Sequence, residues 1–171
     1  QQFVTPLTFQ ALSGKPVLIS LWDAGSGDGM EHIHLSRDAD LLLVAPATAN
    51  VIGKFAGGIA DDFLSALHLA TKAPVLMAPA MNTNMWEHPA TQKNVSALRE
   101  HGVFVVEPGS GELACGDYGS GRMAEPNSIV AEVKLRLQVQ RKRDLRGLRV
   151  LITAGGTREP IDAVRFIGNR S

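Results

Sequence analysis

The stretch Leu41-Leu42-Leu43-Val44-Ala45-Pro46-Ala47-Thr48-Ala49-Asn50 predicts a buried strand that passes directly into a helix. Its first five residues are apolar without polar alternation, as in a strand covered on both faces. A helical pattern follows, which we expect over Ala47–Phe55. This order is the repeating unit of a doubly wound α/β fold.

The same alternation recurs along the whole chain. Further strands are expected at four apolar runs: Val17–Leu21, Val75–Ala78, Val103–Val106 and Val150–Thr153. Helical patterns stand between them, after Met30, over Asp61–Ala70, over Thr91–Glu100 and from Pro126 onward. The chain therefore predicts a mainly parallel sheet, with its ligand site outside the carboxyl ends of the strands.

Composition and charge narrow the class of protein. Among 171 residues, 17 lysines and arginines balance 17 aspartates and glutamates. No net field therefore favours nucleic acid or a membrane surface as a partner. The apolar runs are too short to span a bilayer and no signal peptide opens the chain, so we expect a soluble, cytoplasmic protein.

A domain boundary is expected near residue 141. The segment 141–147 is short, charged and almost free of apolar residues, which favours a solvated linker over a phosphate-binding cluster. We assign 1–140 to a first domain and 148–171 to the beginning of a second α/β domain. Because no methionine opens the chain and an apolar segment stands just before its end, we interpret the sequence as a piece of a longer polypeptide.

Cys115 is the only cysteine and lies in the glycine-rich segment 111–126. Glycines at this density predict a mobile loop, in which a thiol is more often reactive than in a core strand. A lone cysteine can also be a small buried hydrophobic residue. The sequence leaves both interpretations open.

Polar residues fall where the layout predicts ligand contacts. His32, after the glycine-rich segment 24–29, can take a proton near neutral pH, or can be a hydrated surface histidine. His32 and His34 do not share a helical face, so no metal pair is expected. Thr48 and Asn50 can bind the polar edge of a flat ring, although Thr48 can also cap a helix. Asn82 can hold a carboxylate through a neutral amide, or form an ordinary turn.

Four motifs in this order resemble the homo-oligomeric flavin-containing cysteine decarboxylases. They are His32-Ile33, Ala45–Asn50 with Ile52–Gly58, Pro79–Asn82 and Ala114–Asp117. The resemblance covers nearly all of 1–125. The stretches 152–162 and 164–171 resemble the opening of a phosphopantothenate–cysteine ligase domain, which shares a chain with the decarboxylase in some members.

The resemblance implies FMN as cofactor and phosphopantothenoylcysteine as substrate, decarboxylated to phosphopantetheine in coenzyme A synthesis. It implies that His32 is the catalytic base, that Asn82 holds the substrate carboxylate, and that Cys115 is the acid on a flexible substrate lid. The positions that line the flavin are Thr48, Ala49, Asn50, Val51 and Ala80, and Ala114 contacts the substrate. In the ligase segment, Arg165 and Asn169 match residues that form and use a cytidylyl intermediate, with CTP and Mg²⁺ as the ligase's cofactors.

The resemblance also implies a homo-oligomer, a trimer or a multiple of it, with a dodecamer for the parent protein. His32 would then act on a flavin held largely by a neighbouring subunit. The family's opening strand–helix unit, with the turn that cradles the FMN phosphate, is not found before Gln1. Two alternatives share this fold: a flavin-binding regulatory subunit, and a decarboxylase of peptides that end in cysteine. The trio His32, Asn82 and Cys115 favours the enzyme, and the segment 148–171 argues against the peptide decarboxylase.

Overall fold

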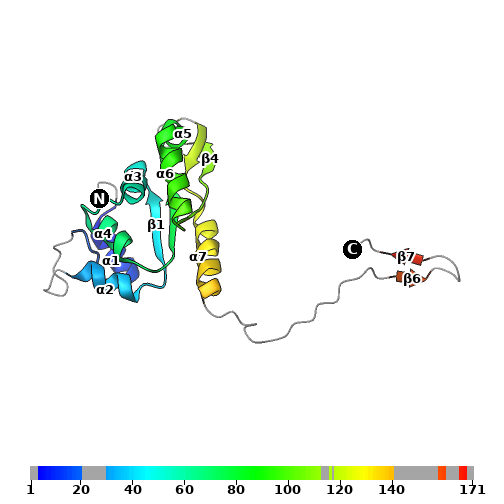
Figure 1. Ribbon diagram of the computed structural model, residues 1–171, viewed down its shortest axis with the longest axis horizontal. Helices are drawn as coiled ribbons and strands as arrows, with labels where there is room; N and C mark the ends of the chain where they lie inside the picture. The colour runs from blue at the N-terminus through cyan, green and yellow to red at the C-terminus, as the bar shows by residue number, and fades with distance from the viewer. Residues whose placement is uncertain are drawn as a thin grey trace. The chain divides into compact units, whose positions relative to one another are not determined.

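The computed structural model describes residues 4–20, 30–112, 116, 118–140, 158–160 and 166–168 (Figure 1). The chain divides into two units, Gln1–Val139 and Gln140–Ser171. In the second unit, β6 (Arg158–Pro160) and β7 (Phe166–Gly168) pair antiparallel, with Glu159 opposite Ile167. The remaining description concerns the first unit.

A parallel sheet in the order β1-β2-β3 forms the centre of the first unit. Its strands are β1 (Leu42–Ala47), β2 (Val75–Pro79) and β3 (Phe104–Val105). Every residue of β2 is buried, as expected for a central strand with helices on both faces. The predicted fold class, a mainly parallel α/β sheet with flanking helices, is confirmed.

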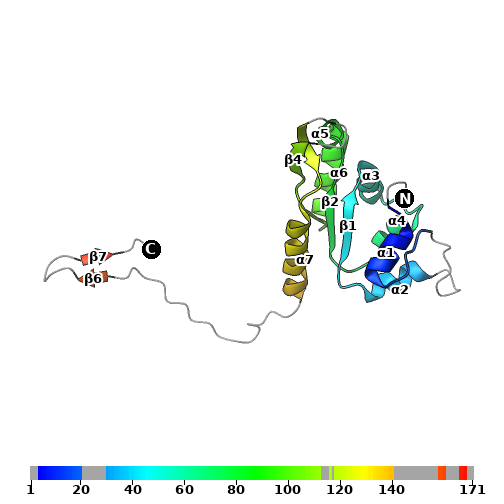
Figure 2. The same ribbon diagram turned by 180° about the vertical axis from the view of Figure 1, so that it is seen from behind.

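Helices cover both faces of this sheet (Figures 1 and 2). In chain order they are α1 (Pro6–Ser13), α2 (Glu31–Asp38), α3 (Ala49–Gly57), α4 (Phe63–Ala70), α5 (Thr83–Glu87), α6 (Pro89–Glu100) and α7 (Pro126–Gln140). Met77 of β2 packs with residues of α3 and α6, whereas the next residue, Ala78, packs with Ile129 of α7. Successive side chains of a strand point to opposite faces, so β2 joins two cores.

Local sequence signals account for where several helices begin. Thr48 precedes α3, and Asp62 precedes α4, where its side chain and that of Ser65 form a capping box. Pro126 is the first residue of α7, a position that needs no backbone N–H. The predicted helices are therefore found, with ends that differ by a few residues.

The strand expected at Val17–Leu21 is not formed over its described residues. Val17 to Ser20 have no regular structure, and the Ile19 side chain is 52% exposed. In the described part of the chain, β1 pairs only with β2. An apolar run becomes a strand only where a neighbouring strand pairs with its backbone, and no described strand pairs with residues 17–20. Leu21 and the expected strand at 150–153 lie outside the described residues.

The segment 111–126, which we expected to be a mobile loop, contains ordered strands. Gly109–Glu112 forms β4 and Tyr118–Arg122 forms β5, and the two pair antiparallel. The loop expectation was wrong for β5, because Gly119 and Gly121 let its backbone approach residues 81–83 closely, and β4 pairs with β5. Cys115 itself lies outside the described residues.

Candidate functional site

The motifs assigned to a ligand meet at the carboxyl ends of β1 and β2. Thr48 and Ala49 follow β1 directly, and Ala80 follows β2. The Ala80 N–H donates a hydrogen bond to the Ala47 carbonyl at 3.0 Å, so the two motifs lie side by side. This is the edge of the sheet where the fold class predicts a ligand.

The first motif presents small and polar groups. Thr48 and Asn50 are exposed, and Ala49 is half-buried. Val51 faces inward and packs against the core that contains Ile52. The structure therefore separates the proposed flavin residues into two kinds: Val51 supports the helix from the core side, whereas the Thr48 and Asn50 side chains reach solvent.

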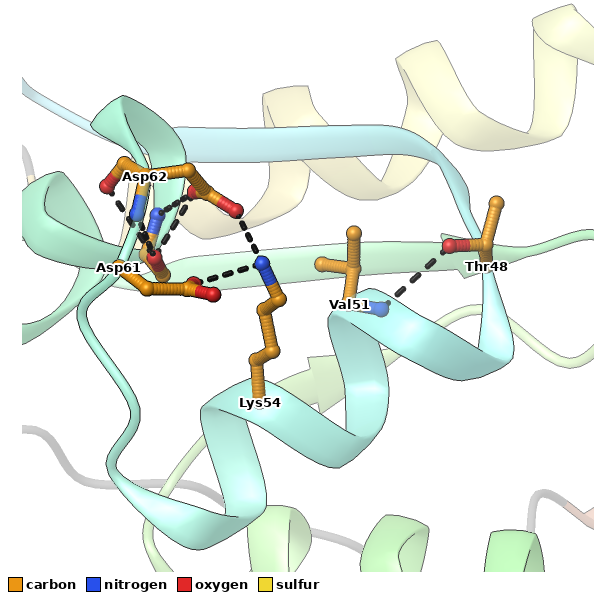
Figure 3. Close-up of polar contacts among 6 residues, drawn as sticks. Thr48, Val51, Lys54, Asp61 and Asp62 are labelled. Atoms are coloured by element: carbon orange, nitrogen blue, oxygen red, sulfur yellow. Dashed lines mark hydrogen bonds and ion pairs between the residues drawn. The ribbon is translucent and has the colours of Figure 1, made fainter. Parts of the chain in front are cut away.

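Thr48 acts as the N-cap of α3. Its Oγ1 accepts a hydrogen bond from the Val51 N–H at 3.4 Å (Figure 3). The capping alternative raised from the sequence is confirmed. A hydroxyl that accepts one hydrogen bond still has its own proton to donate, so capping is compatible with binding a ligand.

An ion-pair cluster ties α3 to α4 (Figure 3). The Lys54 Nζ lies 2.6 Å from Asp61 Oδ1 and 2.6 Å from Asp62 Oδ2. Asp62 Oδ1 also accepts from the Ser65 N–H at 2.8 Å. Hydrogen bonds from Lys54 and Ser65 lower the pKa of Asp62 to about 2, and the two carboxylates raise the pKa of Lys54. The cluster fixes the helix whose first turn borders the candidate site.

We expect Asp62→Asn to remove an acid-sensitive part of the stability. The folded-state pKa of Asp62, about 2, lies below the ordinary 3.8, so its contribution is complete above pH 4 and is lost as the pH falls toward 2. Because the side chain is 46% exposed, water screens the pair and we expect about 1 kcal/mol at pH 7. Urea unfolding at pH 7 and at pH 2.5 measures the difference in unfolding free energy between the wild type and the variant. The variant isolates the ion pair because an asparagine amide can still cap α4.

The control for this prediction is Asp61→Asn, which breaks one ion pair and leaves the cap in place. If the unfolding free energies of the wild type and of Asp62→Asn differed by the same amount at both pH values, the acid-sensitive contribution assigned to Asp62 would be contradicted.

His32 is half-buried in the first turn of α2, and its Nδ1 is buried without a hydrogen-bond partner among the described residues. Two other buried side-chain atoms in the described residues lack a hydrogen-bond partner, His68 Nδ1 and Arg136 Nε, but each of these side chains packs against an aromatic ring. His68 stacks on Phe55 at a centroid distance of 3.8 Å, and the Arg136 guanidinium covers the Phe104 ring. Among the described residues, the His32 imidazole has no aromatic contact of this kind.

A single chain does not place His32 beside the other candidate residues. Figures 1 and 2 both show α2 at the end of the sheet where β1 begins, whereas Thr48 and Ala80 follow the ends of β1 and β2. Within one chain, α2 and the Thr48–Ala80 edge therefore lie toward opposite ends of the sheet.

Asn82 is held between two residues that are bound to β5. The Met81 N–H donates to the Gly121 carbonyl at 2.9 Å, and Thr83 Oγ1 donates to the Ser120 carbonyl at 2.7 Å. Asn82 Oδ1 accepts from the Asn84 N–H at 2.9 Å and caps α5, which confirms the turn interpretation. The amide NH₂ is the group that would donate to a carboxylate, so the cap and the predicted role use different ends of the side chain.

Sequence reasoning missed the partners that hold Asn82. Thr83, Ser120 and Glu87 form a chain of contacts, because Ser120 Oγ donates to Glu87 Oε1 at 2.8 Å. The available signal was the alternation of glycines at 119 and 121, which marks a strand that another backbone approaches closely.

Other predicted site residues lie outside the described part of the chain, namely Ala114, Cys115, Arg165 and Asn169. Within the described ranges, no group of three histidine, cysteine or acidic side chains is arranged to hold a metal ion. Over the same ranges, no helix has the length and apolar character needed to cross a membrane.

Two protein-family models and several known proteins match this sequence. A family model described as Flavoprotein matches residues 1–138, and one described as DNA/pantothenate metabolism flavoprotein C-terminal domain matches 145–171. The coenzyme A biosynthesis bifunctional protein CoaBC of Mycobacterium tuberculosis (strain H37Rv) is 49% identical over 172 residues, 99% of this chain and 41% of the relative. The CoaBC protein of Bacillus subtilis (strain 168) is 49% identical over 170 residues, 99% of this chain and 42% of the relative. The chain spans about two fifths of the length of these relatives.

Solved structures share the fold. A variant of a PPC decarboxylase complexed with pantothenoylaminoethenethiol matches with a TM-score of 0.68 and 40% identity, over 72% of this chain and 71% of that chain. The FMN binding protein AtHal3 matches with a TM-score of 0.65 and 40% identity, over 73% of this chain and 71% of that chain. With a family model that covers 1–138 and relatives at these identities, the chain belongs to the Flavoprotein family and has the fold of PPC decarboxylase.

Proposed function

We propose that this chain carries an FMN-dependent decarboxylase of coenzyme A synthesis, which converts phosphopantothenoylcysteine to phosphopantetheine in the cytoplasm. The observation that supports it most is the meeting of the Thr48–Asn50 and Ala80–Asn82 segments at one edge of the sheet, joined by the Ala80–Ala47 hydrogen bond. A flavin site and a carboxylate-binding amide are thereby neighbours. The names of the CoaBC relatives and of the PPC decarboxylase structure support the same reaction.

The residues at this edge fit a flavin. Thr48 and Asn50 offer exposed polar groups at the first turn of α3, where the backbone N–H groups and the helix dipole favour electron-rich ligand atoms. Ala49 and Ala80 are small and half-buried, so a flat ring can approach the backbone. In this proposal Thr48, Ala49, Asn50 and Ala80 line the ring, and Val51 supports them from the core.

The bound FMN would supply the oxidation of the cysteinyl thiol and the later return of hydride, for which no side chain has an equivalent. His32 takes a proton from the substrate during the oxidation, and Asn82 orients the carboxylate that leaves as carbon dioxide. Ala114 contacts the substrate, and Cys115 donates a proton to the enethiolate that remains after carbon dioxide has left. An imidazole is the side chain that most often serves as a general base in proteins, which suits this role.

The proposal includes an assembly in which subunits share the site. Because α2 lies at the end of the sheet where β1 begins, and the proposed flavin residues follow the carboxyl ends of β1 and β2, His32 would serve a flavin held by another subunit. A trimer, or a multiple such as a dodecamer, satisfies this arrangement. Residues 141–147 would link the decarboxylase domain to a ligase domain beginning at 148, in which Arg165 and Asn169 serve a reaction that uses CTP and Mg²⁺.

A second candidate function is decarboxylation of a smaller cysteine-derived substrate. A cysteine/cysteine sulfinic acid decarboxylase of an unknown prokaryotic organism is 49% identical over 98% of this chain and 47% of that relative. The same base and the same carboxylate-binding amide would serve either substrate, so the residues around the rest of the substrate decide between them.

Two measurements on the purified full-length protein test the proposal. We expect the absorbance bands of bound flavin, and carbon dioxide release from phosphopantothenoylcysteine but not from cysteine or cysteine sulfinate. Release from the smaller substrates alone would favour the second candidate. Bound flavin without release from any of the three would favour a flavin-binding regulatory protein.

Asn82 and Cys115 are expected to fail at different steps. Asn82→Asp places a negative charge against the substrate carboxylate, so the reaction stops before the flavin absorbance changes. Cys115→Ser replaces a thiol by a much weaker acid, so the substrate is oxidised and decarboxylated but not released as product. Single-turnover absorbance with mass analysis of the substrate distinguishes the two. Identical behaviour of both variants, without any decarboxylated species, would leave Cys115 as a structural thiol.

A further inference from the structure

The strand β5 is fastened to the segment that carries Asn82 at two consecutive carbonyl groups. Ser120 O accepts from Thr83 Oγ1 at 2.7 Å, and Gly121 O accepts from the Met81 N–H at 2.9 Å. We call these two hydrogen bonds the β5 anchor. They bracket Asn82 on both sides in sequence, so its backbone has little freedom to move away from β5.

Two glycines make this approach possible. A Cβ at Gly119 would lie 2.4 Å from Thr83 Oγ1, and a Cβ at Gly121 would lie 2.4 Å from the Met81 carbonyl oxygen. Real side chains do not occupy such distances. The anchor is therefore a close contact of backbone with backbone and with one side chain, which only glycine permits at these two positions.

The anchor also joins the two proposed catalytic regions through the covalent chain. Cys115 stands between β4 and β5 in sequence, and β5 is bound to the residues on each side of Asn82. A side chain supplies one of the two anchor bonds, and that side chain is Thr83. The other bond joins two main-chain groups, Met81 N–H and Gly121 O, so replacing the Thr83 side chain leaves both of its partners in place.

We propose that Thr83 is a positioning residue that fixes the Asn82 amide for the substrate carboxylate by holding residues 81–83 against β5. This proposal rests on the proposed decarboxylase function. Thr83 touches neither substrate nor cofactor in it, and acts only through the backbone of Asn82. A residue of this kind should affect substrate binding more than the chemical step, because the amide meets the carboxylate from the first complex onward.

Thr83→Val tests the proposal, since valine keeps the shape of threonine and removes the donor. In the full-length protein loaded with FMN we expect KM for phosphopantothenoylcysteine to rise about 3- to 10-fold, the equivalent of one hydrogen bond, with little change in kcat. Thr83→Ser, which retains the hydroxyl, should restore KM. The flavin spectrum should be unchanged in both variants.

Hydrogen exchange provides a readout that does not depend on activity. The Met81 amide is bound to Gly121 O, so we expect it to exchange several-fold faster in Thr83→Val than in wild type or in Thr83→Ser. The matched control is Thr91→Val, the same substitution at a buried position of α6, which should change neither KM nor exchange at Met81.

Each outcome decides the proposal. An active wild type whose KM and Met81 exchange are unaltered by Thr83→Val would overturn the positioning role and leave the proposed function intact. A rise in KM that Thr83→Ser does not reverse, or that Thr91→Val reproduces, would reduce Thr83 to a general stability effect. A wild type that does not decarboxylate the substrate would overturn the proposed function itself, and the positioning role of Thr83 with it.

Discussion

His32→Asn is expected to lower decarboxylation by a factor of about 10² to 10⁴ while FMN remains bound, because general acid–base catalysis contributes on this scale. Asparagine is polar and close in size to histidine, but it cannot take a proton near neutral pH. The His32 Nδ1 is buried without a described partner, so the imidazole is not committed to a structural hydrogen bond there. Carbon dioxide release and the flavin absorbance of the same sample measure the two effects.

The control is His34→Asn, an exposed histidine of the same helix, which should retain activity. Undiminished release by His32→Asn would reject the assignment of the base.

Because α2 lies away from the Thr48–Ala80 edge, a second experiment can test whether the site is shared between subunits. If His32 serves a flavin bound by another subunit, mixed oligomers of His32→Asn and Asn82→Asp chains should recover activity that neither variant has alone. Recovery requires that one site can take both intact residues from different chains. Failure to recover, in mixtures shown to exchange subunits, would place the whole site within one chain.

Gly121→Ala is expected to destabilise the protein by about 3 kcal/mol. Two costs add here. The residue has φ of +116°, which an L side chain rarely adopts, and its Cβ would lie 2.4 Å from the Met81 carbonyl oxygen. Since the Met81 oxygen belongs to the backbone and the Cβ is fixed directly to the Gly121 backbone, no side-chain rotation relieves the contact and β5 must separate from residues 81–83. Thermal or urea unfolding measures the loss.

Gly102→Ala separates the two costs. Gly102 also has positive φ, at +85°, but a Cβ there would meet nothing within 4 Å. We expect it to lose only about 1 kcal/mol, the cost of the backbone conformation. Equal losses in the two variants would show that the contact with Met81 carries no energy.

Local signals gave correct predictions over much of the fold. Thr48 caps α3, the helical pattern over Asp61–Ala70 contains α4, and Pro126 opens α7. The buried strand β2 followed from an apolar run without alternation. Such predictions succeed because a cap or a covered strand is specified within a few neighbouring residues. The edge where the Thr48 and Ala80 segments meet followed from the strand order of the fold class.

The errors occurred where a segment depends on a distant partner. Val17 to Ser20 have the composition of a strand, yet no described strand pairs with them. The glycines of β5 predicted a mobile loop, but carbonyls there accept hydrogen bonds from Met81 and Thr83.

The sequence by itself determined the α/β class, the presence of the predicted helices and the order of the motifs along the chain, because each depends on neighbouring residues. Only the tertiary structure decided that β5 binds both sides of Asn82 and that α2 lies at the other end of the sheet from Thr48. Thr83 and Ser120 are 37 residues apart, and a hydrogen bond over that separation leaves no periodic or local trace in the sequence. Which backbone groups meet at such a junction is set by how the sheet and helices pack, and therefore appears only once the chain is folded.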